Sequence, residues 1–126
     1  MPIRTYRDLQ VYQESYSAAI EVAGLTKSFP RLEQVELARQ LRRAARSVPA
    51  NIVEGWAKRN SAAEFKRYLQ TALGSCQETR MWLDMSRDEG YIADETHRKL
   101  AAKYESIGAK LVALWKRWTG PQKVTS

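Results

Sequence analysis

Apolar residues recur along this chain at steps of three and four, which is the spacing of one face of an α-helix. The first such stretch opens with a capping-box-like segment, Thr5–Asp8, in which aspartate replaces the usual glutamate or glutamine. It ends before Phe29–Pro30, because the residue before proline is pushed out of the helical region. We expect its core face to consist of Leu9, Tyr12, Tyr16, Ile20 and Ala23.

The second stretch runs from about Leu32 to Lys58 and contains Pro49, which removes one backbone donor and frees the carbonyl of Ala45. We expect a kinked but continuous helix, since the apolar period survives on both sides of the proline. The alternative is a break at Ser47–Val48, with Pro49 opening a new helix. The predicted core side carries Leu37, Leu41, Ala44, Ala45, Val48, Ile52 and Trp56.

The third stretch begins with a capping box at Ser61–Glu64 and ends at Gly90, and the fourth begins with Asp94 as N-cap and stops at Gly120–Pro121. Their core positions are Phe65, Leu69, Ala72, Leu73, Cys76 and Leu83, then Leu100, Tyr104, Ile107, Leu111, Leu114 and Trp118. Four helices of similar length with short connections predict an all-α, up-and-down antiparallel four-helix bundle. We expect residues 1–120 to form this single domain and residues 121–126 to be a disordered tail.

Two of these stretches carry a second apolar side. In the third, Met81 and Met85 lie away from the core side, with Trp82 at their flank. A helix that is apolar on two sides is buried on two sides, so we expect the second side to meet another copy of the chain in a homo-oligomer. The alternative is an irregular core that uses both stripes. In the first stretch the second stripe consists of Val11, Ala18, Val22, Leu25 and Phe29.

Charge adds a functional hint to this architecture. The chain of 126 residues has a net charge of +7, and the segment from Arg31 to Arg67 holds nine basic residues against four acidic ones. Such a field attracts polyanions and speeds their encounter with the protein. The alternative is that the excess charge serves solubility alone.

Arginines dominate the centre of this basic segment, at a spacing of i, i+3, i+4 and i+7 that places four guanidinium groups on a solvent-facing side of the helix. Because like charges repel, we expect an anion to neutralise them, and arginine pairs well with phosphate. The predicted nucleic-acid-binding residues are Arg39, Arg42, Arg43, Arg46, Lys58, Arg59, Lys66 and Arg67, with structured RNA or an RNA-containing complex as partner. In the competing account, some of these arginines pair with Glu33, Glu36 or Glu54.

Catalytic chemistry has little support in the sequence. His97 is the only histidine, and Asp94-x-x-His97 is the only segment resembling a di-iron ligand motif, without the second histidine that such a site needs. We therefore expect no enzyme activity, no metal and no organic cofactor. We expect Gln40, Asn51 and Glu54 to hydrogen-bond neighbouring helices rather than a ligand, and Cys76 to be a buried small hydrophobe. Most aromatic residues fit the core period; stacking on unpaired bases is the alternative use.

Nothing in the sequence favours a membrane or an export route. No apolar run approaches 18 residues, and the N-terminal MPIRTYRDLQ lacks the apolar centre of a signal peptide. A single cysteine also excludes an internal disulfide. We expect a cytoplasmic protein without a membrane partner.

Several segments together resemble the four-helix-bundle family named after the 23S ribosomal RNA intervening-sequence protein, from about Arg4 to Trp118. The segments are YRDLQVY at 6–12, Phe29–Pro30, LARQLRRAARSVPANIVEG at 37–55, Glu64–Phe65 and ALGSCQE at 72–78. The resemblance implies a bundle that assembles into a ring-like homopentamer, in a family without established enzymatic activity. It also implies that some members are encoded inside inserts in large-subunit ribosomal RNA genes. A related branch serves diversity-generating retroelements, in which a basic barrel binds nucleic acid and a reverse transcriptase. A protein-interaction scaffold or accessory subunit that does not itself bind nucleic acid is therefore the alternative function.

Overall fold

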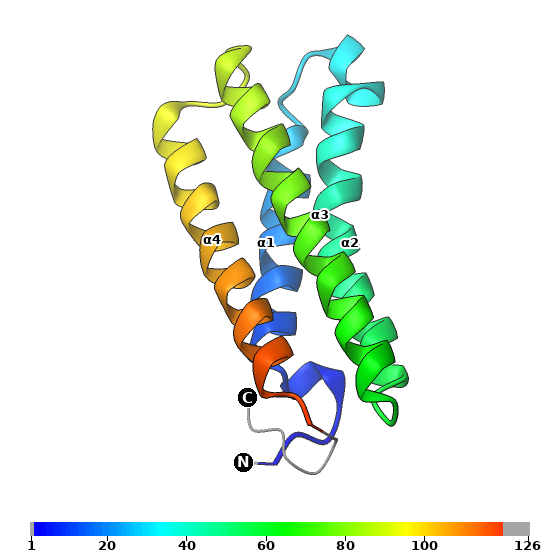
Figure 1. Ribbon diagram of the computed structural model, residues 1–126. Coiled ribbons are helices and arrows are strands. Elements are labelled where there is room, and N and C mark those ends of the chain that lie inside the picture. Colours follow the sequence, from blue (N-terminus) through cyan, green and yellow to red (C-terminus); the bar gives the residue numbers. More distant parts are fainter. Residues whose placement is uncertain (1, 120–126) are drawn as a thin grey trace.

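The computed structural model describes residues 2–119, which form an all-helical bundle without a strand in that range. Consecutive helices run in opposite directions, and both ends of the described chain lie at the same end of the bundle (Figure 1). The elements are η1 (Tyr6–Asp8), α1 (Gln10–Thr26), η2 (Arg31–Val35), α2 (Leu37–Ala57), α3 (Ala62–Asp88) and α4 (Asp94–Arg117). The predicted up-and-down four-helix bundle is confirmed. The predicted tail, 121–126, lies outside the described residues.

The first two helices begin later than the sequence pattern predicts. The capping box at Thr5 and Asp8 is present, but it closes a single 3-10 turn, and α1 begins only at Gln10 because Leu9 is extended. Residues 31–35 form a second 3-10 segment rather than the first turn of α2. Glu36, with φ −114° and ψ −101°, separates this segment from the helix.

The helix α2 continues through Pro49 without a break, as predicted, and the proline is buried. In its last turn, α2 comes very close to α3 at Gly55. A Cβ atom added at Gly55 would lie 2.9 Å from the Cβ of Tyr68 and 3.1 Å from Cδ1 of Phe65. The glycine therefore permits the contact between these two helices.

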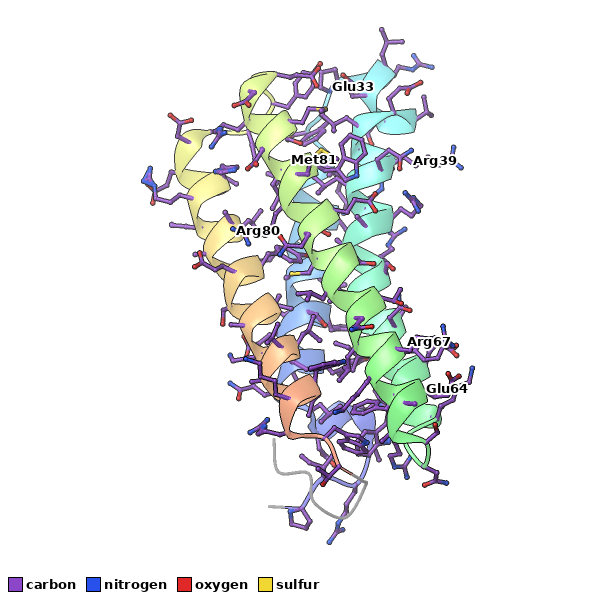
Figure 2. The ribbon with its side chains drawn as sticks, in the orientation of Figure 1. Glu33, Arg39, Glu64, Arg67, Arg80 and Met81 are labelled. Carbon is purple, nitrogen blue, oxygen red and sulfur yellow. The ribbon has the colours of Figure 1, made fainter. Side chains whose placement is uncertain are left out.

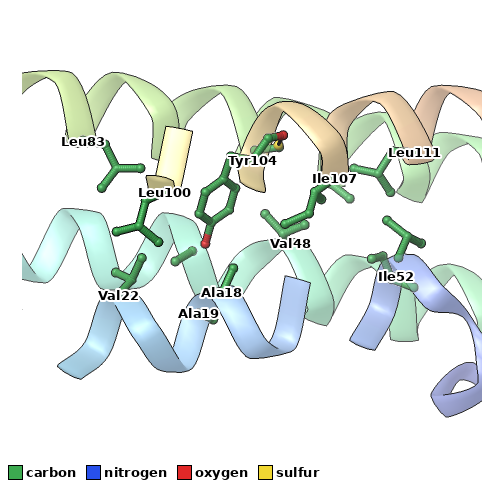
Figure 3. Packing of buried hydrophobic residues seen from close by; sticks show 14 of the residues in the cluster. Ala18, Ala19, Val22, Val48, Ile52, Leu83, Leu100, Tyr104, Ile107 and Leu111 are labelled. Atoms are coloured by element: carbon green, nitrogen blue, oxygen red, sulfur yellow. Dashed lines mark hydrogen bonds between the residues drawn. The ribbon is translucent and has the colours of Figure 1, made fainter. Parts of the chain in front are cut away.

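The core faces of α2, α3 and α4 agree closely with the predicted ones. All seven predicted positions of α2 are buried, and Tyr104 of α4 is fully buried. Figure 3 shows the ring of Tyr104 reaching from α4 towards Ala18 and Ala19 of α1. Burial raises the pKa of Tyr104, and its hydroxyl has no hydrogen-bond partner among the described residues.

Leu9 is buried as predicted, but beyond it the two apolar stripes of α1 are exchanged relative to the prediction. The stripe expected to meet another copy, from Val11 to Phe29, packs into the core, with Val22 fully buried. In the stripe expected to face the core, Tyr16 is 53% exposed and Ile20 is 60% exposed. The reason is steric, because the small side chains of Ala18 and Ala19 leave the room that Tyr104 fills. A second apolar side exists on α1 as predicted, but it is the other one.

Candidate nucleic-acid interface

The eight predicted RNA-binding residues separate into two groups along the bundle. Arg39, Arg42, Arg43 and Arg46 lie along the first half of α2, and the others flank the α2–α3 turn. Figure 2 shows this separation, with Arg39 near one end of the bundle and Arg67 near the other.

Arg42 does not face solvent, contrary to the prediction. It is half-buried, and its guanidinium donates hydrogen bonds to Oγ1 of Thr26 at 3.1 Å, to Oε1 of Gln34 at 3.3 Å and to the Gln34 carbonyl at 3.1 Å. Gln34 in turn donates to the carbonyls of Thr26 and Phe29. Arg42 therefore ties α2 to the α1–α2 connection, and we leave it out of the interface.

Arg43 follows the competing account, although its partner is none of the three glutamates considered there. Its guanidinium forms an ion pair with Glu78 of α3 at 3.2 Å and also donates to Gln40. Glu78 accepts a further hydrogen bond from the indole of Trp82. Because the pair is exposed, it contributes at most about 1 kcal/mol to stability. Arg39 and Arg46 are exposed and form no ion pair with the described residues.

Asn51 was expected to hydrogen-bond a neighbouring helix, but it reaches α3 only indirectly, through Ser47 of its own helix. Its amide donates to the carbonyl and the hydroxyl of Ser47, and the Ser47 hydroxyl lies 2.7 Å from that of Ser75 on α3. The network joins α2 to α3 beside Pro49. The side-chain amide of Asn51 is therefore already hydrogen-bonded within the bundle.

The second group of predicted residues is joined at the same end of the bundle by cations that the sequence reasoning missed. We call this end the basic end; it comprises residues 4–8, residues 54–67 and residues 116–117, and it holds eight basic and three acidic residues. In a bundle with an even number of antiparallel helices, the first and last segments meet the α2–α3 turn. That topology was the signal available from the sequence. The missed cations are Arg4, Arg7, Lys116 and Arg117.

Of the three carboxylates of the basic end, only Glu64 forms an ion pair with a described residue. Asp8 accepts hydrogen bonds from the backbone of Arg4 at 2.9 Å and of Thr5 at 3.0 Å, and these bonds lower its pKa. Glu64 pairs with Arg67 at 3.1 Å, which lowers the pKa of Glu64. Among the described residues, Arg67 is the only cation of the basic end in an ion pair.

The opposite end of the bundle has the reverse balance. Residues 27–36 and 84–99 hold five basic and seven acidic residues. Three of these cations form ion pairs, Arg87 with Asp88 and both Arg98 and Lys99 with Glu95. His97 lies 2.7 Å from Asp84, with the Arg87 guanidinium beside its ring. Positive charge is thus concentrated at one end of the molecule.

Aromatic rings accompany the cations of the basic end. Arg59 lies over the ring of Trp56 at 4.5 Å, and Lys66 lies over that of Trp115 at 4.9 Å. Lys58 donates to the Tyr68 hydroxyl at 2.9 Å, and this contact is the main cause of the lowered pKa of Tyr68. Every cation–ring pair found among residues 2–119 belongs to this end.

Two shallow apolar grooves run along opposite edges of the bundle. The α1–α2 groove has a volume of about 370 Å³ and is lined by Tyr16, Ile20, Val53 and the exposed Arg46, among others. The α3–α4 groove has a volume of about 150 Å³ and is lined by Leu73, Val112 and Trp115, among others. Each edge therefore has exposed apolar surface.

The described part of the chain has neither a metal-ligand cluster nor a membrane-spanning helix. No group of three or more histidine, cysteine, aspartate or glutamate residues there is placed to hold a metal ion. None of its helices has the length and apolarity that a membrane crossing needs. Cys76 is buried, and its thiol donates to the carbonyl of Tyr104.

Comparison with known proteins gives a family and a fold relative. The family model described as 23S rRNA-intervening sequence protein matches residues 7–113. A crystal structure of a protein of unknown function from the S23 ribosomal protein family of Bacteroides thetaiotaomicron is similar, with a TM-score of 0.77 and 26% sequence identity. The similarity covers 84% of this chain and 95% of that one. No curated protein matches the chain.

Proposed function

The chain belongs to the 23S rRNA-intervening sequence protein family, and from this premise we propose that it is a non-enzymatic, homo-oligomeric protein that binds RNA through its basic end. The observation that carries the proposal is the concentration of largely unpaired cations at one end of the bundle. Arginine and lysine in such a cluster neutralise phosphates and release counterions, which supplies most of the affinity of sequence-independent binding. The family description connects its members with ribosomal RNA, which makes RNA the polyanion of choice.

The structure changes which residues we assign to the interface. Lys58, Arg59, Lys66 and Arg67 stay in it, joined by the four cations of η1 and the end of α4. Arg39 and Arg46 form a secondary patch on the side of the bundle. Arg43 is partly occupied by Glu78.

A charge-matched comparison tests the RNA contact. In one variant Lys58, Arg59, Lys116 and Arg117 are changed to glutamine; in the control, Lys27, Arg31, Arg98 and Lys99 at the opposite end are changed instead. Both variants lose the same formal charge. We expect only the first to lose RNA affinity, with the slope of log K against log salt shallower by about 0.7–0.9 per lost phosphate contact. Equal losses in both variants, or none in the first, would reject the basic end as the site.

Self-association forms the second part of the proposal. The exposed Tyr16 and Ile20 lie on one edge of the bundle and the α3–α4 groove on the other, so one copy can present its α1–α2 edge to the α3–α4 edge of the next. Such a head-to-tail contact generates rings when its rotation closes. Repeated basic ends then multiply weak contacts into avidity. The number five rests on the family resemblance.

Light scattering of the purified protein measures the assembly directly. We expect a mass near five times 14.5 kDa, and Ile20→Glu should dissociate the assembly because it places a charge in the apolar groove. Ser17→Glu, at an exposed position on the same helix, is the control. A monomer of 14.5 kDa for the parent protein at micromolar concentration would contradict self-association.

An accessory role towards another protein, such as a reverse transcriptase, is the second candidate function. It is favoured by apolar side chains that are exposed away from both grooves, including Leu32 at 84% and Val35 at 67%. Binding through these residues would be nearly insensitive to salt, whereas binding of RNA through the basic end weakens steeply as salt rises.

A further inference from the structure

The basic end differs from a plain cluster of surface cations in how its guanidinium groups are held. Three of them lie over aromatic rings: Arg7 over Tyr6 at 4.7 Å, Arg59 over Trp56 at 4.5 Å and Arg67 over Tyr68 at 4.5 Å. These pairs come from η1, from the end of α2 and its turn, and from the start of α3. They surround one end of the bundle from three separate elements.

Arg59 shows how firmly such a group is placed. Its Nη1 donates to the carbonyl of Trp56 at 3.0 Å, which ties the side chain to the end of α2 while the ring of Trp56 supports it from below. Trp56 is only 7% exposed, because it packs edge-on against Phe65 and Trp118. The ring and the carbonyl together fix the plane of the guanidinium, and the Arg59 side chain stays partly exposed to solvent.

Arg67 is fixed in a similar way. Glu64 accepts two hydrogen bonds from its guanidinium, at 3.1 and 3.2 Å, while the Tyr68 ring lies against it. The Tyr68 hydroxyl also accepts from Lys58. An ion pair that cancels part of the charge on Arg67 would weaken a purely electrostatic contact with phosphate. It does not weaken stacking on the guanidinium plane.

From these three layered pairs we infer that the basic end binds unpaired nucleotides of single-stranded RNA, with bases stacked on the guanidinium–ring pairs and phosphates held by the surrounding lysines and arginines. This inference rests on the proposed RNA-binding function and specifies its substrate class. Bases stack readily on aromatic rings and on arginine planes when they are unpaired. In an A-form duplex the bases are stacked on one another, so only phosphates and 2′-hydroxyls would meet this end.

Cations without carboxylate partners suit the phosphates between such bases. Arg4, Lys116 and Arg117 form no ion pair with the described residues, and Arg117 lines a groove of about 210 Å³ between α1 and α4. Leu9 and Leu114 line the same groove. The basic end thus combines stacking platforms with cations that have no carboxylate partner among the described residues.

A charge-conserving substitution separates stacking from electrostatics. In the test variant Arg7, Arg59 and Arg67 are all changed to lysine, which keeps the net charge but removes the planar groups. The matched control changes Arg39 and Arg46 to lysine, away from the basic end. The probes are a labelled 12-nucleotide oligo(U) and a 12-base-pair RNA duplex, measured by fluorescence anisotropy over a series of salt concentrations.

We expect the parent protein to bind the oligo(U) strand about tenfold or more tightly than the duplex at equal salt, as stacking of one or two bases would give. The lysine variant should lose about tenfold in affinity for the strand, keep its salt slope, and bind the duplex like the parent. The lysine variant should also show less quenching of its tryptophan emission by the strand than the parent protein shows. Circular dichroism confirms that the variant is folded.

Each other outcome has one meaning. If the parent binds strand and duplex equally, or if the lysine variant binds the strand as the parent does, the stacking inference is wrong while the proposed RNA binding stands. If neither RNA binds, the proposed function itself fails. The same follows if vesicles containing anionic phosphatidylglycerol bind the basic end and RNA does not.

Discussion

Replacing Gly55 with alanine is the sharpest test of how α2 and α3 meet. In an exposed helix position, alanine would stabilise the chain over glycine by about 1 kcal/mol. At Gly55, however, the new Cβ would lie 2.9 Å from the Cβ of Tyr68, 3.1 Å from Cδ1 of Phe65 and 3.4 Å from the Phe65 carbonyl oxygen. The Cβ of Tyr68 and the carbonyl of Phe65 are held in place by the α3 backbone, so they cannot rotate away. The two helices must therefore separate.

Overpacking of this kind costs about 1–3 kcal/mol, which outweighs the gain in helix propensity. We expect Gly55→Ala to lower the free energy of unfolding by about 1 kcal/mol, or the melting temperature by roughly 3–5 °C. Urea unfolding followed by circular dichroism and by tryptophan emission measures it. Protein concentration is held constant, because assembly shifts apparent stability.

Gly74→Ala provides the matched control within α3. No atom lies within 4 Å of a Cβ built there, so alanine should raise the free energy of unfolding by about 0.5–1 kcal/mol. The two substitutions make the same chemical change, but they should change the free energy of unfolding in opposite directions. If Gly55→Ala stabilises the protein as Gly74→Ala does, the close approach of α2 and α3 is not a constraint and the reasoning fails.

Four further predictions concern single side chains. Arg42→Gln should cost about 1–3 kcal/mol because it leaves the buried Thr26 hydroxyl and the Gln34 carbonyl without their donor, while Arg46→Gln, the exposed control, should change stability by less than about 0.5 kcal/mol. Tyr104→Phe should raise the free energy of unfolding by about 1 kcal/mol, since it removes a buried hydroxyl without a partner; a loss of stability would show that the hydroxyl is satisfied in solution. Burial raises the pKa of Cys76 to about 11, so the thiol should resist a disulfide reagent at pH 8 until the chain unfolds. The stability that the buried thiol contributes should fall only as pH rises above the ordinary thiol pKa towards 11. Rapid labelling of the folded protein would contradict this. Because the pKa of Asp8 is lowered, the stability that its capping bonds contribute is present above the ordinary carboxyl pKa and is lost as pH falls below it. The amide chemical shifts of Arg4 and Thr5 would follow this titration. A titration midpoint at or above the ordinary pKa would contradict the prediction.

The sequence predicted α2 well because its pattern is unambiguous. Large apolar residues and alanines occupy one side and charges the other, so the core face follows from the helical period alone. The first helix is different, since both of its sides are apolar. The choice between them depends on the ring of Tyr104, which arrives from α4 and needs alanines rather than Tyr16 or Ile20 opposite it. No local pattern contains that information.

The candidate site shows the same limit. The spacing of Arg42 predicts its place on the helix, but the Thr26 and Gln34 groups that bind it come from a connection whose 3-10 path the pattern did not indicate. The basic end, in contrast, could have been predicted from the sequence. The predicted topology already places the start of the chain and the end of α4 beside the α2–α3 turn, and the cations of those segments are visible in the sequence.

The unequal charge of the two ends also gives each subunit an electric dipole along the bundle axis. In a ring whose bundles stand parallel, these dipoles add, and every positive pole appears on the same rim. In a pair related by a two-fold axis across the bundles, they would cancel. A ring of parallel bundles would therefore have one rim that attracts polyanions and an opposite rim, with more acidic than basic residues, that does not, so a polyanion would be oriented before it makes its first contact.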